Sequence, residues 1–305
     1  RPLSRGLGDV YKRQLFQQGP ISIDQPYFKQ DKTDITLDKI IWNGDIYVTQ
    51  KEKTNLILEG DLSLDDTKLD QEALKASMKS IKASGKTELD LTDRVNISLQ
   101  QNFTIKKAVI KSSDAMQLST NINLQTDSQI NLNAEQTQIQ HKGQLTLTKL
   151  EATQKNLKAL IEKAQSAGSA EFVLKENTQI SLNQTVNVDR LAVKDNDQGL
   201  DLLADIEVKT NSQIAVEDKG TNIKYNGSVK VGNVSAQLQA LAAKLKSVQW
   251  QGNADVFSSA QTDAQTNVSS NGQLNLENLK LTNPNQKTEL ANLQNFSVGL
   301  SLIHI

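Results

Sequence analysis

LDLTDRVNISLQQNFTI, from Leu89 to Ile105, is the stretch of this chain that determines its fold class. Its apolar residues all fall on odd-numbered positions, and most of the positions between them carry polar side chains. These apolar residues are Leu89, Leu91, Val95, Ile97, Leu99, Phe103 and Ile105. Alternation with a period of two predicts a strand with one buried and one solvated face, and sheets of such strands are usually antiparallel.

The same alternation recurs along the chain, which is therefore predicted to be mainly β. Further alternating residues are Leu56, Leu58, Leu62 and Leu64; Leu118, Ile122 and Leu124; Leu200, Leu202, Ile206 and Val208; and Ile223, Tyr225, Val229 and Val231. Asn and Gln together number 57, whereas aromatic residues make up only 4% of the chain. Such a composition favours an extended body of one-sided strands over a thick globular core.

Three stretches have helical spacing instead. Leu74, Met78 and Ile81 stand at i, i+4 and i+7, and similar patterns occur in two later segments. The later residues are Leu157, Leu160, Ile161 and Ala164, and then Leu238, Leu241, Leu245 and Val248. The spacing predicts short amphipathic helices near residues 70–83, 152–167 and 234–248.

Glycines reveal an internal repeat of about 83 residues. Gly85, Gly168 and Gly252 are 83 and 84 residues apart, and so are Gly60, Gly143 and Gly227. The predicted unit is several strands, one amphipathic helix and a glycine. Stacked units of this kind make elongated bodies in which each unit contacts its neighbours.

The two ends do not share this pattern. RPLSRGLGDVYKRQ (residues 1–14) and SLIHI (residues 301–305) are interpreted as translated sequencing adapters or disordered tails, and we exclude them from the predicted fold. Residues 15–300 are then expected to be a fragment of one repetitive, elongated β domain.

Composition also excludes several classes of function. The 305 residues include no Cys, which rules out disulfides, thiol nucleophiles and zinc–thiolate sites. Two His make a His-based catalytic or metal cluster unexpected, and a net charge of −1 offers no basic surface for nucleic acid. We therefore expect no enzymatic activity, no cofactor, no metal site and no nucleic-acid partner.

A few individual residues have both a functional and a structural interpretation. The acidic pair Asp65–Asp66 and the run Asp195–Asp197 are predicted to be turn residues rather than calcium ligands. His141 is predicted to be a solvent-facing strand residue. Trp42 and Trp250 are expected to be covered aromatics rather than anchors at a lipid interface.

Two segments resemble bacterial AsmA-like proteins, most closely the large branch whose domains have no assigned function. ISIDQPYFKQDKTDITLDKIIWNGDIYV (Ile21–Val48) is followed by Gly-centred alternating strands, an expected short Leu-rich helix and another Gly. LENLKLTNPNQKTELANLQNFSVGL (Leu276–Leu300) is similar to the same element recurring, with a strand, an Asn–Pro turn and a second strand. The resemblance covers Leu15–Leu300 and lies in the repeat layout.

The resemblance implies a long twisted sheet curled into a taco-like groove with an apolar concave face. It also implies a protein anchored in the inner membrane by one N-terminal helix outside this chain and extending through the periplasm. Members of the family are implicated in moving phospholipid toward the outer membrane and in envelope integrity. Other envelope proteins are possible partners on this basis.

Three short helices could not cover all the predicted strands, so part of the apolar face would be left for phospholipid acyl chains. The candidate groove residues are Leu89, Leu91, Val95, Ile97, Leu99, Ile122, Leu124, Leu182, Val186, Val188, Leu202, Ile206 and Val208. The alternative is a structural or adhesive β-repeat protein of the cell surface.

Overall fold

The computed structural model describes residues 13–17, 20–50, 54–92, 94–113, 115–260 and 266–304. Most of the first predicted tail lies outside these residues, although Arg13 and Gln14 belong to the first strand. In the second predicted tail, residues 301–304 lie in the last strand.

The described residues form seventeen β-strands and no helix. The strands are β1 (Arg13–Gln17), β2 (Ile21–Asp24), β3 (Tyr27–Gln30), β4 (Thr33–Thr36), β5 (Lys39–Gln50), β6 (Thr54–Gln71), β7 (Leu74–Leu91), β8 (Val95–Ser112), β9 (Met116–Leu132), β10 (Thr137–Gln154), β11 (Leu157–Leu174), β12 (Thr178–Asp195), β13 (Leu200–Glu217), β14 (Gly220–Leu238), β15 (Leu241–Ser259), β16 (Thr266–Asn283) and β17 (Thr288–His304).

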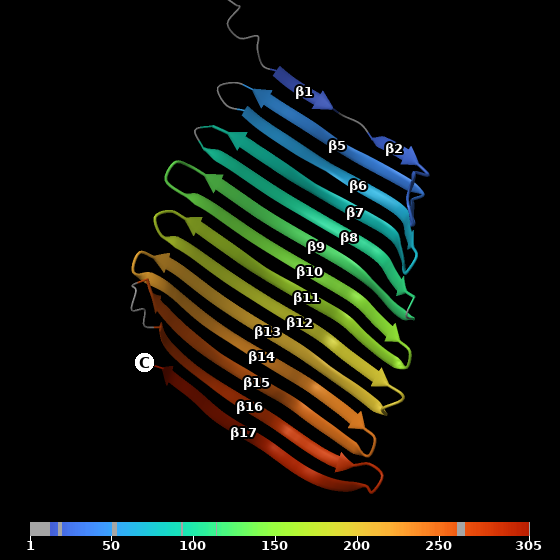
Figure 1. Ribbon diagram of the computed structural model, residues 1–305, viewed down its shortest axis with the longest axis vertical. Helices are drawn as coiled ribbons and strands as arrows, with labels where there is room; N and C mark the ends of the chain where they lie inside the picture. The colour runs from blue at the N-terminus through green and yellow to red at the C-terminus, as the bar shows by residue number, and fades with distance from the viewer. Residues whose placement is uncertain are drawn as a thin grey trace, which may run out of the picture.

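All the strands belong to one antiparallel sheet, which is long, open and curled. From β5 to β17 each strand pairs with the next one along the chain, so the sheet is a meander (Figure 1). The short strands β1 and β2 pair with β5, while the β3–β4 hairpin joins the sheet where β4 pairs with β6. The prediction of a mainly β, antiparallel and repeated sheet is confirmed.

One face of the sheet is apolar because most apolar residues of each strand are paired with apolar residues of the next strand. Residues directly opposite each other in a ladder share a face. One such row is apolar in every strand from β5 to β17: Ile40, Leu64, Ile81, Ile105, Ile122, Leu147, Ala164, Val188, Ile206, Val231, Val248, Leu276 and Phe296. We call the face that carries this row the apolar face, and the opposite one the polar face.

A second row marks a kink that crosses the sheet. Every even-numbered strand from β6 to β16 has one residue with a left-handed backbone, at φ values of 46° to 57°. These residues are Asp66, Lys107, Lys149, Arg190, Asn233 and Asn278, and the ladder pairing skips all of them. An extra residue of this kind bends a strand and increases its twist. It also shifts the alternation by one, so the apolar face continues on the far side of the kink.

The kink explains why the three predicted helices are wrong. Residues 70–83, 152–167 and 234–248 lie mainly in β7, β11 and β15, where Lys79, Glu162 and Lys246 drop out of the ladder beside the kinked residues. From Leu74 to Met78 the strand takes two ordinary steps of two residues, and from Met78 to Ile81 it takes one step of three because Lys79 drops out of the ladder. Together these steps give the spacing i, i+4, i+7. Leu74, Met78 and Ile81 therefore follow a helical period although the segment is extended.

The sequence repeat corresponds to four strands. The glycine row crosses the sheet at Gly44, Gly60, Gly85, Gln101, Thr126, Gly143, Gly168, Gln184, Thr210, Gly227, Gly252 and Gly272. The order Gly, Gly, Gln, Thr in β6–β9 recurs in β10–β13, 83 or 84 residues later. The kinked residues recur at the same interval, as in Lys107 and Arg190.

Several of these glycines are required by close backbone contacts. A Cβ at Gly168 would lie 2.5 Å from the carbonyl oxygen of Asn183, and one at Gly252 would lie 2.7 Å from that of Asn271. Neither oxygen belongs to a flexible side chain, so a methyl group would force neighbouring strands apart. By contrast, a Cβ at Gly232 would make an ordinary contact, 3.5 Å from the Lys246 carbonyl oxygen.

We therefore expect opposite effects from two glycine-to-alanine substitutions. Gly168→Ala should lower the free energy of unfolding by about 1–3 kcal/mol, the usual cost of overpacking. Gly232→Ala should leave it unchanged or raise it by about 0.4–1 kcal/mol, because alanine restricts the unfolded chain. Urea unfolding followed by circular dichroism measures both, and equal effects of the two substitutions would contradict the close approach at Gly168.

Candidate functional site

The apolar face has no closed core beneath a second layer. Among the described residues the only buried apolar side chains are Ala108 and Ala204, and no large side chain is completely buried. Leu91 and Leu182 are 40% and 39% exposed. Figure 1 shows the strands side by side in a single layer. The apolar face is thus half-covered by its own side chains and open above them.

The ladders bring the thirteen predicted groove residues to this one face. Leu89 is opposite Ile97 and Leu91 is opposite Val95, between β7 and β8. Ile122 and Leu124 of β9 are opposite Ile105 and Phe103 of β8, so they join the same face. Leu99 shares this face because it lies two residues from Ile97 along β8.

The remaining predicted residues lie on β12 and β13. Val186 is opposite Val208 and Val188 is opposite Ile206, while Leu182 is opposite Ser212. Leu202 is opposite Val193, beyond the kink of β12. The two groups are separated in the sheet by β10 and β11, and the apolar row through Leu147 and Ala164 connects them.

Sequence reasoning missed the residues of β10 and β11 that make the face continuous. They include Leu145, Leu147, Ile161 and Phe172. Residues 152–167, which include the first part of β11, were predicted to be helical, so the apolar residues of β11 were not assigned to the groove. From β6 to β16, Asp195 at the end of β12 is the one charged residue of the described strands that the ladders place on the apolar face.

Large rings fill the space above the glycine row. A Cβ at Gly252 would lie 2.7 Å from Cζ2 of Trp250, and one at Gly272 would lie 3.0 Å from its Nε1. Trp42 lies in the same way over Gly44 and Gly60, and Tyr225 lies over Gly227. Packing of aromatic rings over glycines in neighbouring strands is a known way to stabilise a sheet. Both tryptophans are therefore held against the apolar face of the sheet.

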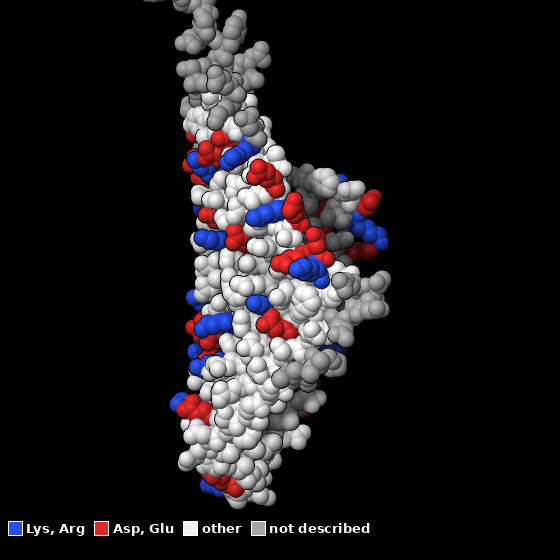
Figure 2. Space-filling view, turned by 90° about the vertical axis from the view of Figure 1, so that its left-hand side faces the viewer, with Lys and Arg blue, Asp and Glu red and all other residues white. Residues whose placement is uncertain are grey.

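Charged side chains are confined almost entirely to the polar face and the kink. Figure 2 looks at the border of the sheet that lies on the left of Figure 1, and it shows charges mainly along one vertical margin and in the upper part. The lower part of this view is nearly all uncharged. Ion pairs such as Lys194–Asp201, at 3.0 Å, have both side chains more than half exposed, so each contributes little stability.

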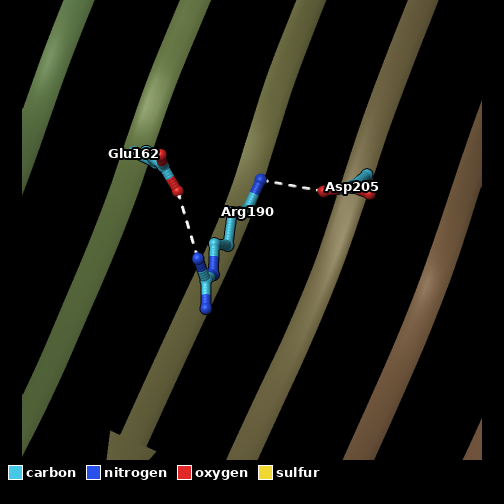
Figure 3. Close-up of polar contacts among 3 residues, drawn as sticks. All are labelled: Glu162, Arg190 and Asp205. Carbon is cyan, nitrogen blue, oxygen red and sulfur yellow. Dashed lines mark hydrogen bonds and ion pairs between the residues drawn. The ribbon is translucent and has the colours of Figure 1, made fainter.

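A polar network supports the kink between β11 and β14 (Figure 3). Asp205 Oδ1 accepts the backbone N–H of Arg190 at 2.8 Å, and its Oδ2 accepts a hydrogen bond from Asn233 at 2.6 Å. The Arg190 guanidinium lies 3.4 Å from the Glu162 carboxylate. One repeat earlier, Asn121 accepts the N–H of the kinked Lys107 at 2.9 Å. These side chains satisfy backbone N–H groups that the ladder leaves unpaired.

The kink network gives a graded prediction for residue 205. Asp205→Ala should lower the free energy of unfolding by about 1–3 kcal/mol, because an accepting group for two donors is lost. Asp205→Asn should cost less, since Asn121 performs the same task at the equivalent position. Thermal or urea unfolding of the two variants measures the difference. Equal losses would mean that the carboxylate charge, rather than its position as an acceptor, supports the kink.

Hydrogen bonds lower the pKa of several carboxyl groups, among them Glu277 and Glu171 on the polar face. The Lys246 ammonium holds the pKa of Glu277 below its usual value, with smaller contributions from Ser247 and Lys230. The amides of Gln140 and Gln138 lower the pKa of Glu171 in the same way. Both groups therefore stay ionised at neutral pH and act as fixed acceptors.

The residues considered for chemistry do not assemble into a reactive site. His141 is exposed on β10, as predicted, and its Nδ1 lies 2.7 Å from Ser128 Oγ. No carboxylate among the described residues hydrogen-bonds to the ring, so the pair lacks the third group of a triad. No group of three or more His, Asp or Glu in this part of the chain could hold a metal ion.

The two acidic clusters differ from each other. Asp195 lies at the turn after β12, where its carboxylate accepts the N–H of Asp197 at 2.9 Å, as predicted for a turn. Asp65 and Asp66 instead lie inside β6, and Asp66 is one of the kinked residues. The prediction of a turn there is wrong, because a kink within a strand and a turn between strands favour the same residue types.

Hollows lie on the polar side of the glycine row. The one over β12–β16 has a volume of about 750 Å³, and a second one, of about 520 Å³, lies further along the same row over β6–β9. A third, near the kink of β6–β9, has a volume of about 750 Å³ and is lined by Lys79, Lys106 and Lys107 together with Asp65 and Asp66.

Comparisons with protein-family models, curated proteins and solved structures find no match to this chain. Within the described residues, no helix is long and apolar enough to cross a membrane.

Proposed function

We propose that this chain is part of a non-enzymatic envelope protein whose apolar face binds phospholipid acyl chains and conducts them between the inner and outer membranes. The proposal follows the resemblance to AsmA-like proteins and carries their location in the periplasm with an inner-membrane anchor outside this chain. The observation that supports it is the uncovered apolar face, continuous from β5 to β17.

An open apolar face of this size needs a covering body. Exposed apolar patches beyond a few hundred Å² usually mark a binding surface. A flexible hydrocarbon chain suits a long face on which leucine, isoleucine and valine outnumber polar side chains such as Gln101 and Gln184 of the glycine row, and each buried methylene contributes about 0.8 kcal/mol. The half-exposed leucines on both sides of the glycine row, such as Leu58 and Leu62, are available for such contacts.

Ile97→Asp and Val188→Asp test the proposal. Each puts a carboxylate on the apolar face, where a bound acyl chain would bury it without a partner. We expect wild-type protein, secreted to the periplasm of a bacterial host, to retain phospholipid in native mass spectrometry. Each variant should lose that lipid and bind a fluorescent phosphatidylethanolamine about tenfold more weakly, a change of about 1.4 kcal/mol.

Matched controls place the same charge on the opposite face. Asn96 and Asn187 precede Ile97 and Val188 in β8 and β12, and their side chains point away from the apolar face. Asn96→Asp and Asn187→Asp should keep the lipid. Circular dichroism should show all four variants folded, because none of the four positions is buried. Wild type without lipid, or apolar-face variants that unfold, would favour a structural or adhesive protein instead.

A further inference from the structure

Five asparagines form a ladder across the polar face. Asn183 is opposite Asn211, Asn211 opposite Asn226, Asn226 opposite Asn253, and Asn253 opposite Asn271, in the successive strands β12–β16. Neighbouring strands lie about 4.8 Å apart, so the ladder presents an amide group at nearly regular intervals. The sequence gives no sign of it, because the five residues are separated by irregular numbers of positions.

The ladder forms one wall of the hollow of about 750 Å³ over these strands. The backbone of the glycine row is its floor. The opposite wall consists of Thr185, Lys209, Ser228, Gln251 and Gln273. Lys209 is the one charged residue of the lining, and no aromatic or aliphatic side chain contributes. We call this hollow the asparagine trough.

Most of the trough's amides have unused hydrogen-bonding capacity. Asn211 donates a hydrogen bond to Asn183. Within the described residues, the side-chain amides of Asn226, Asn253 and Asn271 make no hydrogen bond to protein. Each of these groups offers two donors and one accepting oxygen. The trough is therefore a neutral surface that presents donors and acceptors side by side in a regular row.

The fold itself does not require asparagine at these positions. One repeat earlier the equivalent residues are Gln100, Asp127, Lys142 and Ser169, which form the same row of ladder pairs from β8 to β11. The hollow beside them is lined by charged groups, among them Glu59, Asp61 and Lys86. The two repeats share a backbone arrangement and differ in the chemistry of this row, which is neutral in the asparagine trough and includes charged residues beside the hollow over β6–β9.

We propose that the asparagine trough binds a linear, neutral glycan that carries acetamido groups. Hydroxyl and acetamido groups each donate and accept hydrogen bonds, which matches the amides of the ladder. A polymer of similar sugar units also matches a row of similar side chains in successive strands. The near absence of charge disfavours a polyanion, and the polar lining disfavours an acyl chain. This site lies on the face opposite to the proposed lipid surface and is independent of it.

Calorimetric titration with the β-1,4-linked hexamer of N-acetylglucosamine tests the proposal. The wild-type chain should bind it saturably, with a dissociation constant between about 10 µM and 1 mM, and should bind the β-1,4-linked glucose hexamer at least tenfold more weakly. No saturable binding, or equal binding of the two hexamers, would overturn the assignment of an acetamido-bearing glycan.

A swap between the repeats supplies the decisive variant. Asn211→Asp with Asn226→Lys recreates the opposed pair Asp127–Lys142, which the same backbone already accommodates. This double variant should remain folded and lose at least tenfold in affinity. Asn253→Ser, which recreates Ser169, should weaken binding by a smaller factor. Unchanged affinity in the double variant would overturn the location.

The matched control introduces the same charges outside the trough. Asn96 and Asn131 are opposed on the polar faces of β8 and β9, away from the residues that line the trough. Asn96→Lys with Asn131→Asp should leave the affinity for the N-acetylglucosamine hexamer at the wild-type value. A loss equal to that of the swap variant would show that charge anywhere on the polar face reduces binding, and it would overturn the trough as the site.

Discussion

Short turns that hold every strand in register with the next are the constraint on which the rest of this structure depends. The connections from β5 to β17 are two to six residues long, so no strand can slide against its neighbours. Because the side-chain period of a strand is two, a slip of one residue would move every apolar side chain to the opposite face. The apolar row, the glycine row, the kink and the asparagine ladder are all consequences of this single register.

The kink solves a problem that long, one-sided strands would otherwise face. Strands of about eighteen residues twist strongly, and a sheet of many such strands needs local bends to keep its neighbours paired. An added residue such as Arg190 supplies the bend, but it also exposes an unpaired backbone N–H. Asp205, on the neighbouring strand, accepts the N–H of Arg190. Asn121 accepts the N–H of Lys107 in the same way one repeat earlier. Charge and amide groups therefore collect at the kink for a structural reason.

The sequence predicts the strands and the repeat, but not how the repeat is built. Alternation such as that of Leu89 to Ile105 depends only on local residues, so it predicted the end of β7, the start of β8 and the face they share, but not the turn between Leu91 and Val95. The helix predicted near residues 70–83 is wrong because a kinked strand and a helix place apolar residues such as Leu74, Met78 and Ile81 at the same spacing. The glycines at an 83-residue interval were recognised because the interval repeats along the chain. The asparagine ladder could not be recognised, because it exists only once the register of five strands is known.

The meander also determines how the sheet can change in length. Every strand from β7 to β16 contacts only the strands before and after it in the chain, and the surfaces that β6–β9 offer their neighbours recur in β10–β13. Removing or inserting one such block of four strands would rejoin equivalent edges and leave each row of side chains unbroken. The sheet can therefore become longer or shorter by whole blocks of four strands without a change in how its strands pair.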